Sequence, residues 1–306
     1  MVTSATLSRA DRGTLLMNNI DIEHTDWLEQ YGNDFVIVHN PTFKFQARHP
    51  YKLGDVLAVI CNDGEATGTI NLRQYHLRKN NLVIVLADHI MESFEVSPDF
   101  KGTYIFMSQS FLYGLNIGDG YKFYESVENN PCILLDDRTA NAVNSYVNMC
   151  RAMIEISDLN PNTKESLQLL TRLFFLNMGW FIHREAVKKT TDSRQSEVMN
   201  AFISLVKSNY HEHRDVEYYA GRMNLTAKYL TTLIKKASGK PALQWIEDYV
   251  ILDAKAQLSS TQNSIQQICY DLNFPTPSFF GRYFKRAVGM SPSEYRKSIR
   301  MNTDTV

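Results

Sequence analysis

The sequence predicts an α+β protein of two domains, in which an antiparallel β domain with two following helices precedes an all-α domain. Three observations support this fold class: short β-rich runs up to about Ser110, two long amphipathic patterns after them, and a repeated segment in the last third of the chain. At 306 residues the chain is long enough for two domains of ordinary size. Its hydrophobic content of 44% and aromatic content of 11% argue for packed cores and against disorder.

The first part of the chain carries the signals of short strands. Turn-forming residues, such as those at 63–64, 79–81 and 98–99, separate its apolar runs. Because no helical pattern intervenes, we expect an antiparallel sandwich or barrel, whose interior either holds a small molecule or is filled with side chains. The apolar runs are residues 35–38, 56–60, 82–86 and 103–107.

Two longer helices are predicted next. The first covers residues 138–157, with Asp136 or Asp137 as its N-cap and an apolar stripe along one face. The second begins at Thr163 and ends near Glu185. Its apolar residues recur at the spacing of a helix–helix seam, which fits either a homodimer interface or packing onto the sheet. These residues are Leu167, Leu170, Phe174 and Phe181.

A polar, aperiodic segment marks the predicted domain boundary. We expect an N-terminal domain over residues 1–187, a linker over 188–195 and a helical domain over 196–300. The net charge changes sign at the same place. From Gln195 onward there are 14 Lys and Arg and 10 Asp and Glu, whereas the preceding residues contain 18 Lys and Arg and 23 Asp and Glu. A basic C-terminal domain beside an acidic N-terminal one fits a polyanionic partner for the former only.

The last third of the chain repeats itself. Residues 216–239 recur as residues 265–289, with one residue inserted in the second copy. Each copy predicts a short helix, a tight turn at an asparagine, and a second helix that a threonine caps and a glycine ends. Asn224 and Asn273 stand in the two turns, where asparagine tolerates a left-handed backbone better than most residues.

The second helix of each copy has a polar, basic outer face at i, i+3, i+4 and i+7 spacing. Such a face can enter the major groove of DNA, where hydroxyl and cationic groups meet base edges and phosphates. Between Arg222 and Lys240 there are five basic residues and no acidic one, whereas a solvated helix usually mixes both signs. The predicted DNA-binding residues are Lys228, Thr231, Thr232, Lys235, Lys236, Ser278, Gly281, Arg282, Lys285 and Arg286.

Arg282 is the best single candidate for a base contact, because its planar guanidinium can pair with both O6 and N7 of guanine. Gly281 weakens its helix by about 1 kcal/mol relative to alanine, and it either permits close approach to the groove or has no role there. The inner faces of the two helices are predicted to be core. They consist of Tyr229, Leu230, Leu233, Ile234 and Ala237 in the first copy and Phe279, Phe280, Tyr283 and Phe284 in the second.

A helix over residues 241–258 is predicted between the copies. At 1.5 Å per residue it spans about 27 Å, which is comparable with the ~34 Å that separates successive major-groove faces of B-DNA. A rigid connector of this length places the two copies in consecutive major grooves. Because the outer faces of the copies differ, each is expected to recognise a different half of an asymmetric site.

These residues resemble the C-terminal DNA-binding domain of the AraC/XylS family of bacterial transcription regulators. The motifs are KYLTTLIKKASG at 228–239 and SFFGRYFKRAVG at 278–289, which MSPSEYR continues at 290–296. The resemblance covers about residues 196–297. The chain departs from the family at Asn273, where glycine is usual, and at Val250, where arginine is frequent.

The resemblance implies a cytoplasmic, sequence-specific regulator of transcription, with activation as the expected direction and RNA polymerase as an expected partner. It also implies a cupin-like N-terminal barrel that binds a small-molecule effector or mediates dimerisation. A second hypothesis, from another class, is a small-molecule-binding or enzymatic cupin whose helical C-terminal part is a protein-interaction module.

No catalytic activity, metal or cofactor is predicted. The cysteines Cys61, Cys132, Cys150 and Cys269 are scattered without a CxxC pair, which favours reduced thiols over a disulfide framework. His39, His49, His76 and His89 are isolated, and a solvated loop is the preferred interpretation of His211-Glu212-His213. Residues 1–19 lack the pattern of a secretory signal, and no apolar run is long enough to span a bilayer.

Overall fold

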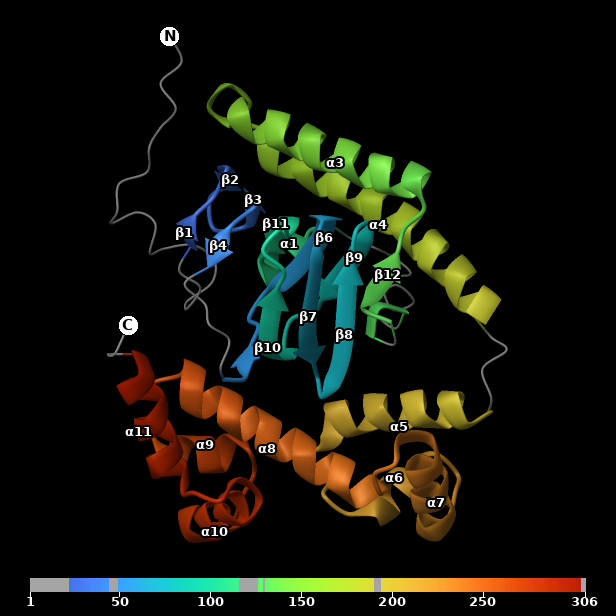
Figure 1. The fold of residues 1–306 in the computed structure, drawn as a ribbon, viewed down its shortest axis with the longest axis vertical. Coiled ribbons are helices and arrows are strands. Elements are labelled where there is room, and N and C mark those ends of the chain that lie inside the picture. The colour runs from blue at the N-terminus through green and yellow to red at the C-terminus, as the bar shows by residue number, and fades with distance from the viewer. Residues whose placement is uncertain (1–21, 44–48, 116–125, 129, 190–193, 304–306) are drawn as a thin grey trace.

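The computed structural model shows layered β-sheets with two long helices on one side and a group of shorter helices on the other (Figure 1). It describes residues 22–43, 49–115, 126–128, 130–189 and 194–303. The predicted fold class is confirmed, because antiparallel strands and two helices precede an all-α part. The segment in which no secretory signal is expected lies outside the described residues.

A six-stranded antiparallel sheet forms the centre of the N-terminal domain, in the spatial order β12-β9-β6-β11-β3-β2. All four apolar runs seen in the sequence lie in this sheet, in β3, β6, β9 and β11. The strands are β2 (Trp27–Tyr31), β3 (Phe35–His39), β6 (Val56–Asp63), β9 (Asn81–Val85), β11 (Lys101–Met107) and β12 (Cys132–Leu134).

A four-stranded antiparallel sheet, in the order β5-β10-β7-β8, packs against one face of the larger sheet. Leu57 and Val59 of the larger sheet and Ala66 and Ile70 of the smaller one belong to the same buried cluster, so side chains fill the space between the sheets. The strands are β5 (Tyr51–Lys52), β7 (Glu65–Ile70), β8 (Arg73–Arg78) and β10 (Ile90–Val96), with a separate pair β1 (Ile22–His24) and β4 (Thr42–Phe43).

The expectation of a barrel is corrected to that of open sheets. Among the strands that the structure describes, no ladder of hydrogen bonds joins the six-stranded sheet to the four-stranded one. The sheets are instead held face to face by apolar side chains, as in a sandwich. The sandwich was the other architecture that the short, evenly spaced strands allow.

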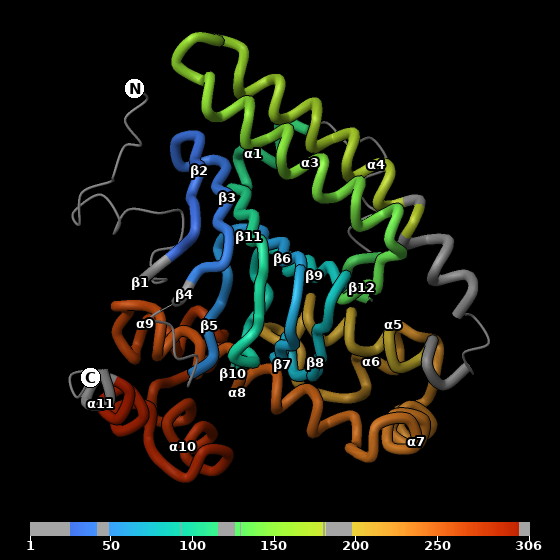
Figure 2. The backbone as a smooth tube through the Cα atoms, turned by 45° about the horizontal axis from the view of Figure 1, so that its top comes forward, coloured from blue at the N-terminus to red at the C-terminus, as the bar shows by residue number. Residues whose placement is uncertain are grey.

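The opposite face of the six-stranded sheet is covered by α1 (Gln109–Tyr113), α3 (Asp137–Glu155) and α4 (Thr163–Lys189). The long helices α3 and α4 lie side by side, joined through a 3-10 turn, η2 (Ser157–Leu159) (Figures 1 and 2). Asp136 caps α3 by accepting a hydrogen bond from the Thr139 amide, which confirms the predicted start.

The seam-like residues of α4 pack onto their own domain. Leu167 and Phe181 are buried, and Leu170 and Phe174 pack against the same core. The ring of Phe174 stacks on Tyr146 of α3 with centroids 4.3 Å apart. Of the two interpretations of this spacing, these contacts support packing within the domain.

Seven helices make up the C-terminal part as described over residues 194–303, and the longest, α8, connects the two repeat copies as predicted. Val250, at the position where the family often has arginine, is fully buried within α8. Residues 190–193 of the predicted linker lie outside the described residues, so the domain limits stay a prediction. The helices are α5 (Arg194–Asn209), α6 (Val216–Arg222), α7 (Ala227–Ser238), α8 (Ala242–Ser260), α9 (Ile265–Asp271), α10 (Pro277–Val288) and α11 (Pro292–Thr303).

Helix α8 also touches the four-stranded sheet (Figure 2). Leu252 and Ala256 of α8 form a small buried cluster with Ile90 of β10. Beside them, the Lys52 ammonium of β5 lies 3.8 Å from the carboxylate of Asp253, which is fully buried in α8. The helix therefore takes part in two hydrophobic clusters, one in the core of the C-terminal part and one at its contact with the sheet.

A second set of polar contacts joins α5 to the N-terminal domain. The Lys207 ammonium lies 2.7 Å from the carboxylate of Glu128, which is also 3.1 Å from the buried imidazole of His89. Arg73 of β8 donates to Asn200 of α5 over 3.1 Å. No helix within the described residues is long and apolar enough to cross a membrane.

Candidate nucleic-acid interface

The first repeat copy folds as a helix, a tight turn and a second helix. The carboxylate of Asp215 caps α6, and the hydroxyl of Thr226 caps α7. Asn224 in the turn has a φ of 55°, and Gly239, with a φ of 76°, ends α7. These are the caps and turn residues that the sequence predicts, and they leave the start of α7 open to solvent.

The second copy repeats this geometry with different cap chemistry. Ser264 caps α9 through a reciprocal pair of hydrogen bonds with Gln267, and Thr276 caps α10. Asn273 has a φ of 52°, so the left-handed conformation that asparagine tolerates is the one this turn requires. Gly289 ends α10 with a φ of 87°.

The predicted DNA-facing residues of α7 lie on its outer side. Leu230 and Ile234 are fully buried on the inner side and fix the rotation of the helix about its axis. On the outer side Lys228, Thr232, Lys235 and Lys236 are exposed and Thr231 is half-buried. Ammonium and hydroxyl groups in this arrangement can donate to phosphates and to acceptors in the major groove.

The same holds for α10, whose inner side is fixed by the fully buried Phe280 and Phe284. Ser278, Arg282, Lys285 and Arg286 are exposed on the outer side and Gly281 is half-buried. The structure thus brings each group of predicted residues together on one helix face. The two faces differ in chemistry, with threonines and lysines on α7 and a serine, a glycine, one lysine and two arginines on α10.

The margins of the two inner faces differ from the prediction. Tyr229 is 46% exposed and Phe279 is 45% exposed, and Ala237 is also exposed, so these three are not core. The core beneath each helix is narrow, because the helix rests on it mainly through one pair of residues at i and i+4. Leu233 and Tyr283 are half-buried beside those pairs.

Arg286 has a partner within the protein. Its guanidinium donates to the carboxylate of Glu247 in α8 over 2.9 Å and lies above the ring of Tyr283, 5.4 Å from its centroid. A phosphate contact by Arg286 would therefore replace an existing ion pair. The sequence carries no signal for this pair, because the two residues lie thirty-nine positions apart in different helices.

Gly281 is not required by the packing of the protein. A Cβ atom placed on it meets nothing within 4 Å, and its φ lies outside the left-handed range. The glycine therefore costs helix stability without an internal benefit. Close approach of the α10 backbone to a ligand would explain its presence.

We expect Gly281→Ala to stabilise the protein by about 1 kcal/mol, because alanine favours the helix. We also expect it to weaken DNA binding, because the added methyl group would lie between α10 and the floor of the groove. Gly221→Ala in α6 is the matched control, since a Cβ there also meets nothing within 4 Å. Thermal unfolding and a duplex titration measure the two effects. An unchanged DNA affinity for Gly281→Ala would show that the glycine has no role at the groove.

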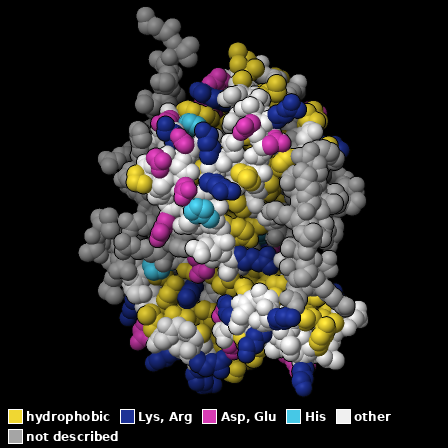
Figure 3. Space-filling view, turned by 45° about the vertical axis from the view of Figure 1, so that its right-hand side comes forward, with side chains coloured by type: hydrophobic (Ala, Val, Ile, Leu, Met, Phe, Trp, Pro, Cys, Tyr) yellow, Lys and Arg dark blue, Asp and Glu magenta, His cyan; other side chains and the backbone are white. Residues whose placement is uncertain are grey.

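Helices α7 and α10 lie at opposite ends of α8, on the side of α8 that faces away from the sheets (Figure 1). In the space-filling view, Lys and Arg side chains gather on the lower part of the molecule, over the C-terminal helices (Figure 3). Acidic side chains are more frequent on the upper part of the same view, over the N-terminal domain. This distribution agrees with the division of charge in the sequence.

The His211-Glu212-His213 segment takes part in internal contacts. The His211 imidazole lies 2.9 Å from the buried carboxylate of Asp253, and the His213 ring stacks on Tyr218 with centroids 3.5 Å apart. Within the described ranges, no group of three or more His, Cys, Asp or Glu side chains is arranged to hold a metal ion.

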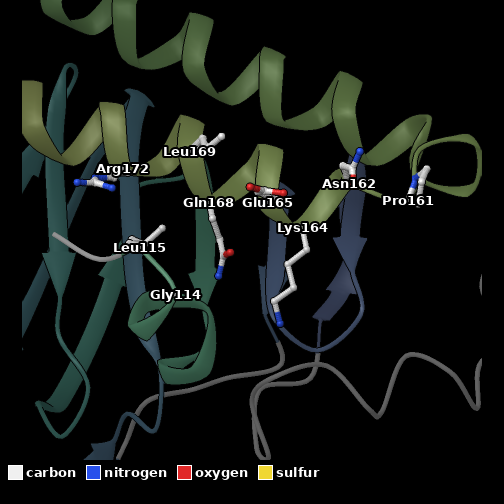
Figure 4. Close-up of a pocket in the computed structure, with 9 residues that line it drawn as sticks. All are labelled: Gly114, Leu115, Pro161, Asn162, Lys164, Glu165, Gln168, Leu169 and Arg172. Atoms are coloured by element: carbon white, nitrogen blue, oxygen red, sulfur yellow. The ribbon is translucent and has the colours of Figure 1, made fainter.

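A pocket of about 470 Å³ lies between α1 and the start of α4 (Figure 4). The Lys164 ammonium at its edge lies 2.6 Å from the carboxylate of Asp34. Burial alone would raise the pKa of Asp34, but hydrogen bonds from Lys164, Ser108 and Ser110 lower this pKa to about 2. The lining residues are Gly114, Leu115, Pro161, Asn162, Lys164, Glu165, Gln168, Leu169 and Arg172.

Comparison with known proteins finds likeness mainly in the C-terminal part. A family model described as a helix-turn-helix domain matches residues 219–298. The raffinose operon transcriptional regulatory protein RafR of Pediococcus pentosaceus is 30% identical over 131 residues, which cover 43% of this chain and 46% of the relative. The arabinose operon regulatory protein of Escherichia coli K12 is 32% identical over 143 residues, which cover 46% and 47%.

The chain thus spans about half the length of these relatives. Among solved structures, the crystal structure of ToxT from Vibrio cholerae O395 is 18% identical and covers 87% of this chain and 99% of that chain, with a TM-score of 0.38.

Two helix-turn-helix units on one connecting helix define the class of tandem helix-turn-helix domains. The caps, turns and outer faces of both units, together with the matched family model and relatives, identify the domain further. In both respects the C-terminal domain is similar to the DNA-binding domains of AraC/XylS-type transcription regulators.

Proposed function

We propose that this chain is a sequence-specific transcription regulator that binds double-stranded DNA through α7 and α10, in two consecutive major grooves. The observation that carries the proposal is the pair of capped helices, each with a polar and basic outer face, at the two ends of one rigid helix. The residues proposed to contact DNA are those predicted above on α7 and α10. The proposal places the protein in the cytoplasm and gives it no catalytic role and no cofactor.

The connecting helix supports simultaneous binding of both units. Helix α8 has 19 residues, and at 1.5 Å per residue it is about 28 Å long. Successive major-groove faces on one side of B-DNA lie about 34 Å apart. The unlike outer faces of α7 and α10 then make contact with two unlike half-sites, so the bound sequence is asymmetric.

Selection of bound duplexes from a random library tests this function. The expected product is a site with two different conserved blocks separated by about one helical turn, or ~10 base pairs. Affinity for it should fall steeply with added salt, because lysine and arginine displace counterions from the phosphates. Failure to bind any duplex at low salt would favour the second hypothesis, in which the helical part binds another protein.

A small-molecule effector and RNA polymerase are further partners in this proposal. The RafR and arabinose relatives are named for the operons that they regulate, which supports control of transcription in response to a metabolite. The pocket beside α4, with Lys164, Glu165 and Arg172 in its wall, offers charged and polar groups to such a molecule. Run-off transcription with purified polymerase, with and without candidate metabolites, tests both partners and the direction of regulation.

The segment from Thr163 to Glu185, which lies within α4, remains the proposed homodimer interface, and we propose that its outer face makes the contact. Leu169, Leu173 and Leu176 are 59%, 57% and 53% exposed and recur at the spacing of a helical stripe. In an interface with two-fold symmetry, the same three leucines of both protomers would be buried. This face is distinct from the seam-like residues that pack onto the sheet.

Leu173→Glu is expected to shift the monomer–dimer equilibrium of the full chain toward the monomer. Burial of a leucine contributes about 1.5–3 kcal/mol, so the dissociation constant should rise by at least roughly tenfold. Sedimentation or light scattering over a concentration series measures this change. Leu134→Glu in β12, at a leucine that is also half-exposed, is the control. An identical effect of both variants, or a monomeric wild type, would contradict the proposed interface.

A further inference from the structure

The two helix-turn-helix units touch each other at a point away from α8. Arg214 immediately precedes the N-cap of α6, in the first unit. Its guanidinium carbon lies 3.7 Å from the ring centroid of Phe274, in the turn of the second unit. Its Nη2 atom also donates to the backbone carbonyl of Leu272, which ends α9.

Arg214 is half-buried between the two units. Burial lowers the pKa of Arg214, while electrostatic interaction with Tyr283, Cys269 and Tyr219 favours its charged form. A guanidinium has a planar face and several N–H donors, so it can stack on a ring and donate to a carbonyl at once. Lysine has the same charge but lacks the planar face.

The segment that carries Arg214 is itself anchored. Tyr219 of α6 donates through its hydroxyl to the His213 carbonyl over 2.7 Å. On the preceding side, the hydroxyl of Tyr210 donates to the Asp253 carboxylate of α8 over 2.7 Å, and the His211 ring bonds to the same group. Residues 210–215 therefore form a strut that is fixed to α8, to α6 and to the second unit.

Both units pack against α8 within one hydrophobic cluster, which sets the distance between them and limits their rotation. The strut adds a direct contact between the units that lies away from the axis of α8. Such a contact restrains the rotation of one unit relative to the other more tightly than packing on α8 alone. Contact with two successive grooves depends on rotation as much as on distance, because the groove winds around the duplex.

We propose that Arg214 is a positioning residue that sets the relative orientation of α7 and α10 and thereby the half-site spacing that the protein accepts. This inference rests on the proposed function. It assigns to Arg214 no contact with DNA, since the guanidinium points into the second unit. Loss of the Arg214 side chain should therefore weaken binding only to duplexes that contact both helix-turn-helix units.

The test compares the full chain with Arg214→Ala and Arg214→Lys on duplexes derived from the selected site. One set has the intact spacing, a second has one or two base pairs added or removed, and a third has one half-site scrambled. For Arg214→Ala we expect roughly tenfold weaker binding at the intact spacing, because a less rigid link lowers the effective concentration of the second unit. We also expect a flatter dependence on spacing and unchanged binding to the single half-site.

Two comparisons distinguish positioning from a loss of charge or fold. Arg78→Ala in β8 removes an exposed cation far from α7 and α10 and should leave all three duplex sets unaffected. Arg214→Lys keeps the charge and should reproduce most of the loss seen with alanine. Phe274→Leu removes the stacked ring from the other side and should add little to Arg214→Ala when the two are combined.

The outcomes separate the inference from the function on which it rests. If the wild type is sensitive to spacing and Arg214→Ala is equally sensitive, the inference is wrong and the function stands. Equal losses on the single half-site and on the full site would also overturn it, because they would indicate damage to one unit. A wild type that binds DNA without regard to spacing would contradict tandem binding and the inference together.

Discussion

Replacement of Arg282 by alanine should make the protein nearly indifferent to one base pair of its site. Arg282 is exposed on the outer face of α10, whose rotation the buried Phe280 and Phe284 fix. A bidentate contact between arginine and guanine discriminates against other bases by about 1–3 kcal/mol, which corresponds to roughly 5- to 150-fold in affinity. The loss should therefore be large for the preferred sequence and small for duplexes already changed at that base pair.

Titration of a set of single-base-pair variants measures this prediction. Lys236→Ala is the matched comparison, because a phosphate contact carries no base information and its loss should weaken all sequences alike. The preference at one position should collapse in Arg282→Ala and persist in Lys236→Ala. A uniform loss across the set for Arg282→Ala would show that its guanidinium contacts phosphate instead.

Asp253→Ala should cost about 3–5 kcal/mol of unfolding free energy, which is the usual range for breaking a buried ion pair. The Asp253 carboxylate is 0% exposed and accepts hydrogen bonds from Tyr210 and His211, with Lys52 3.8 Å away. Its removal leaves these donors and a cation without their common acceptor. Urea unfolding of the full chain measures the loss.

The same carboxylate should make stability depend on pH. Burial alone would raise the pKa of Asp253, but the hydrogen bond from His211, the charge of Lys52 and the hydroxyl of Tyr210 hold the pKa below its ordinary value of 3.8. A lowered folded-state pKa stabilises the protein above the ordinary value, and this contribution is lost as pH falls through the folded-state pKa.

Asp253→Asn keeps the shape of the side chain and removes its titration. The difference between the wild type and Asp253→Asn should therefore be full near neutral pH and should shrink progressively as the pH falls below about 4. Asp271→Asn, at an exposed aspartate of α9, is the control. A difference that stays constant between pH 3 and 7 would show that charge on Asp253 does not contribute.

The strands that the sequence predicts are those covered on both faces. In β6, Ala58 and Ile60 face the helices while Leu57 and Val59 face the smaller sheet, so the strand is a continuous apolar run. The strands of the smaller sheet are short or alternate between buried and exposed positions, as β7 does. That weaker pattern explains why the sequence did not reveal the second sheet or distinguish a sandwich from a barrel.

The C-terminal domain was more predictable because its signals are local. Caps such as Thr226 and Thr276 and turn residues such as Asn224 and Asn273 act within a few residues of their position in the chain. Contacts between distant segments have no such signal. The pairing of Arg286 with Glu247, the strut at Arg214 and the exposure of Tyr229 each depend on how helices meet in three dimensions.

Helix α8 packs against both parts of the molecule. The two parts are therefore not mechanically independent, although they are consecutive in the sequence. An excised fragment that begins near residue 196 would turn Leu252 and Ala256 toward water and would deprive Asp253 of Lys52. The N-terminal fragment would expose Ile90 in return. The two parts are consecutive in the chain, but they share one helix and should lose their structure as a single cooperative unit.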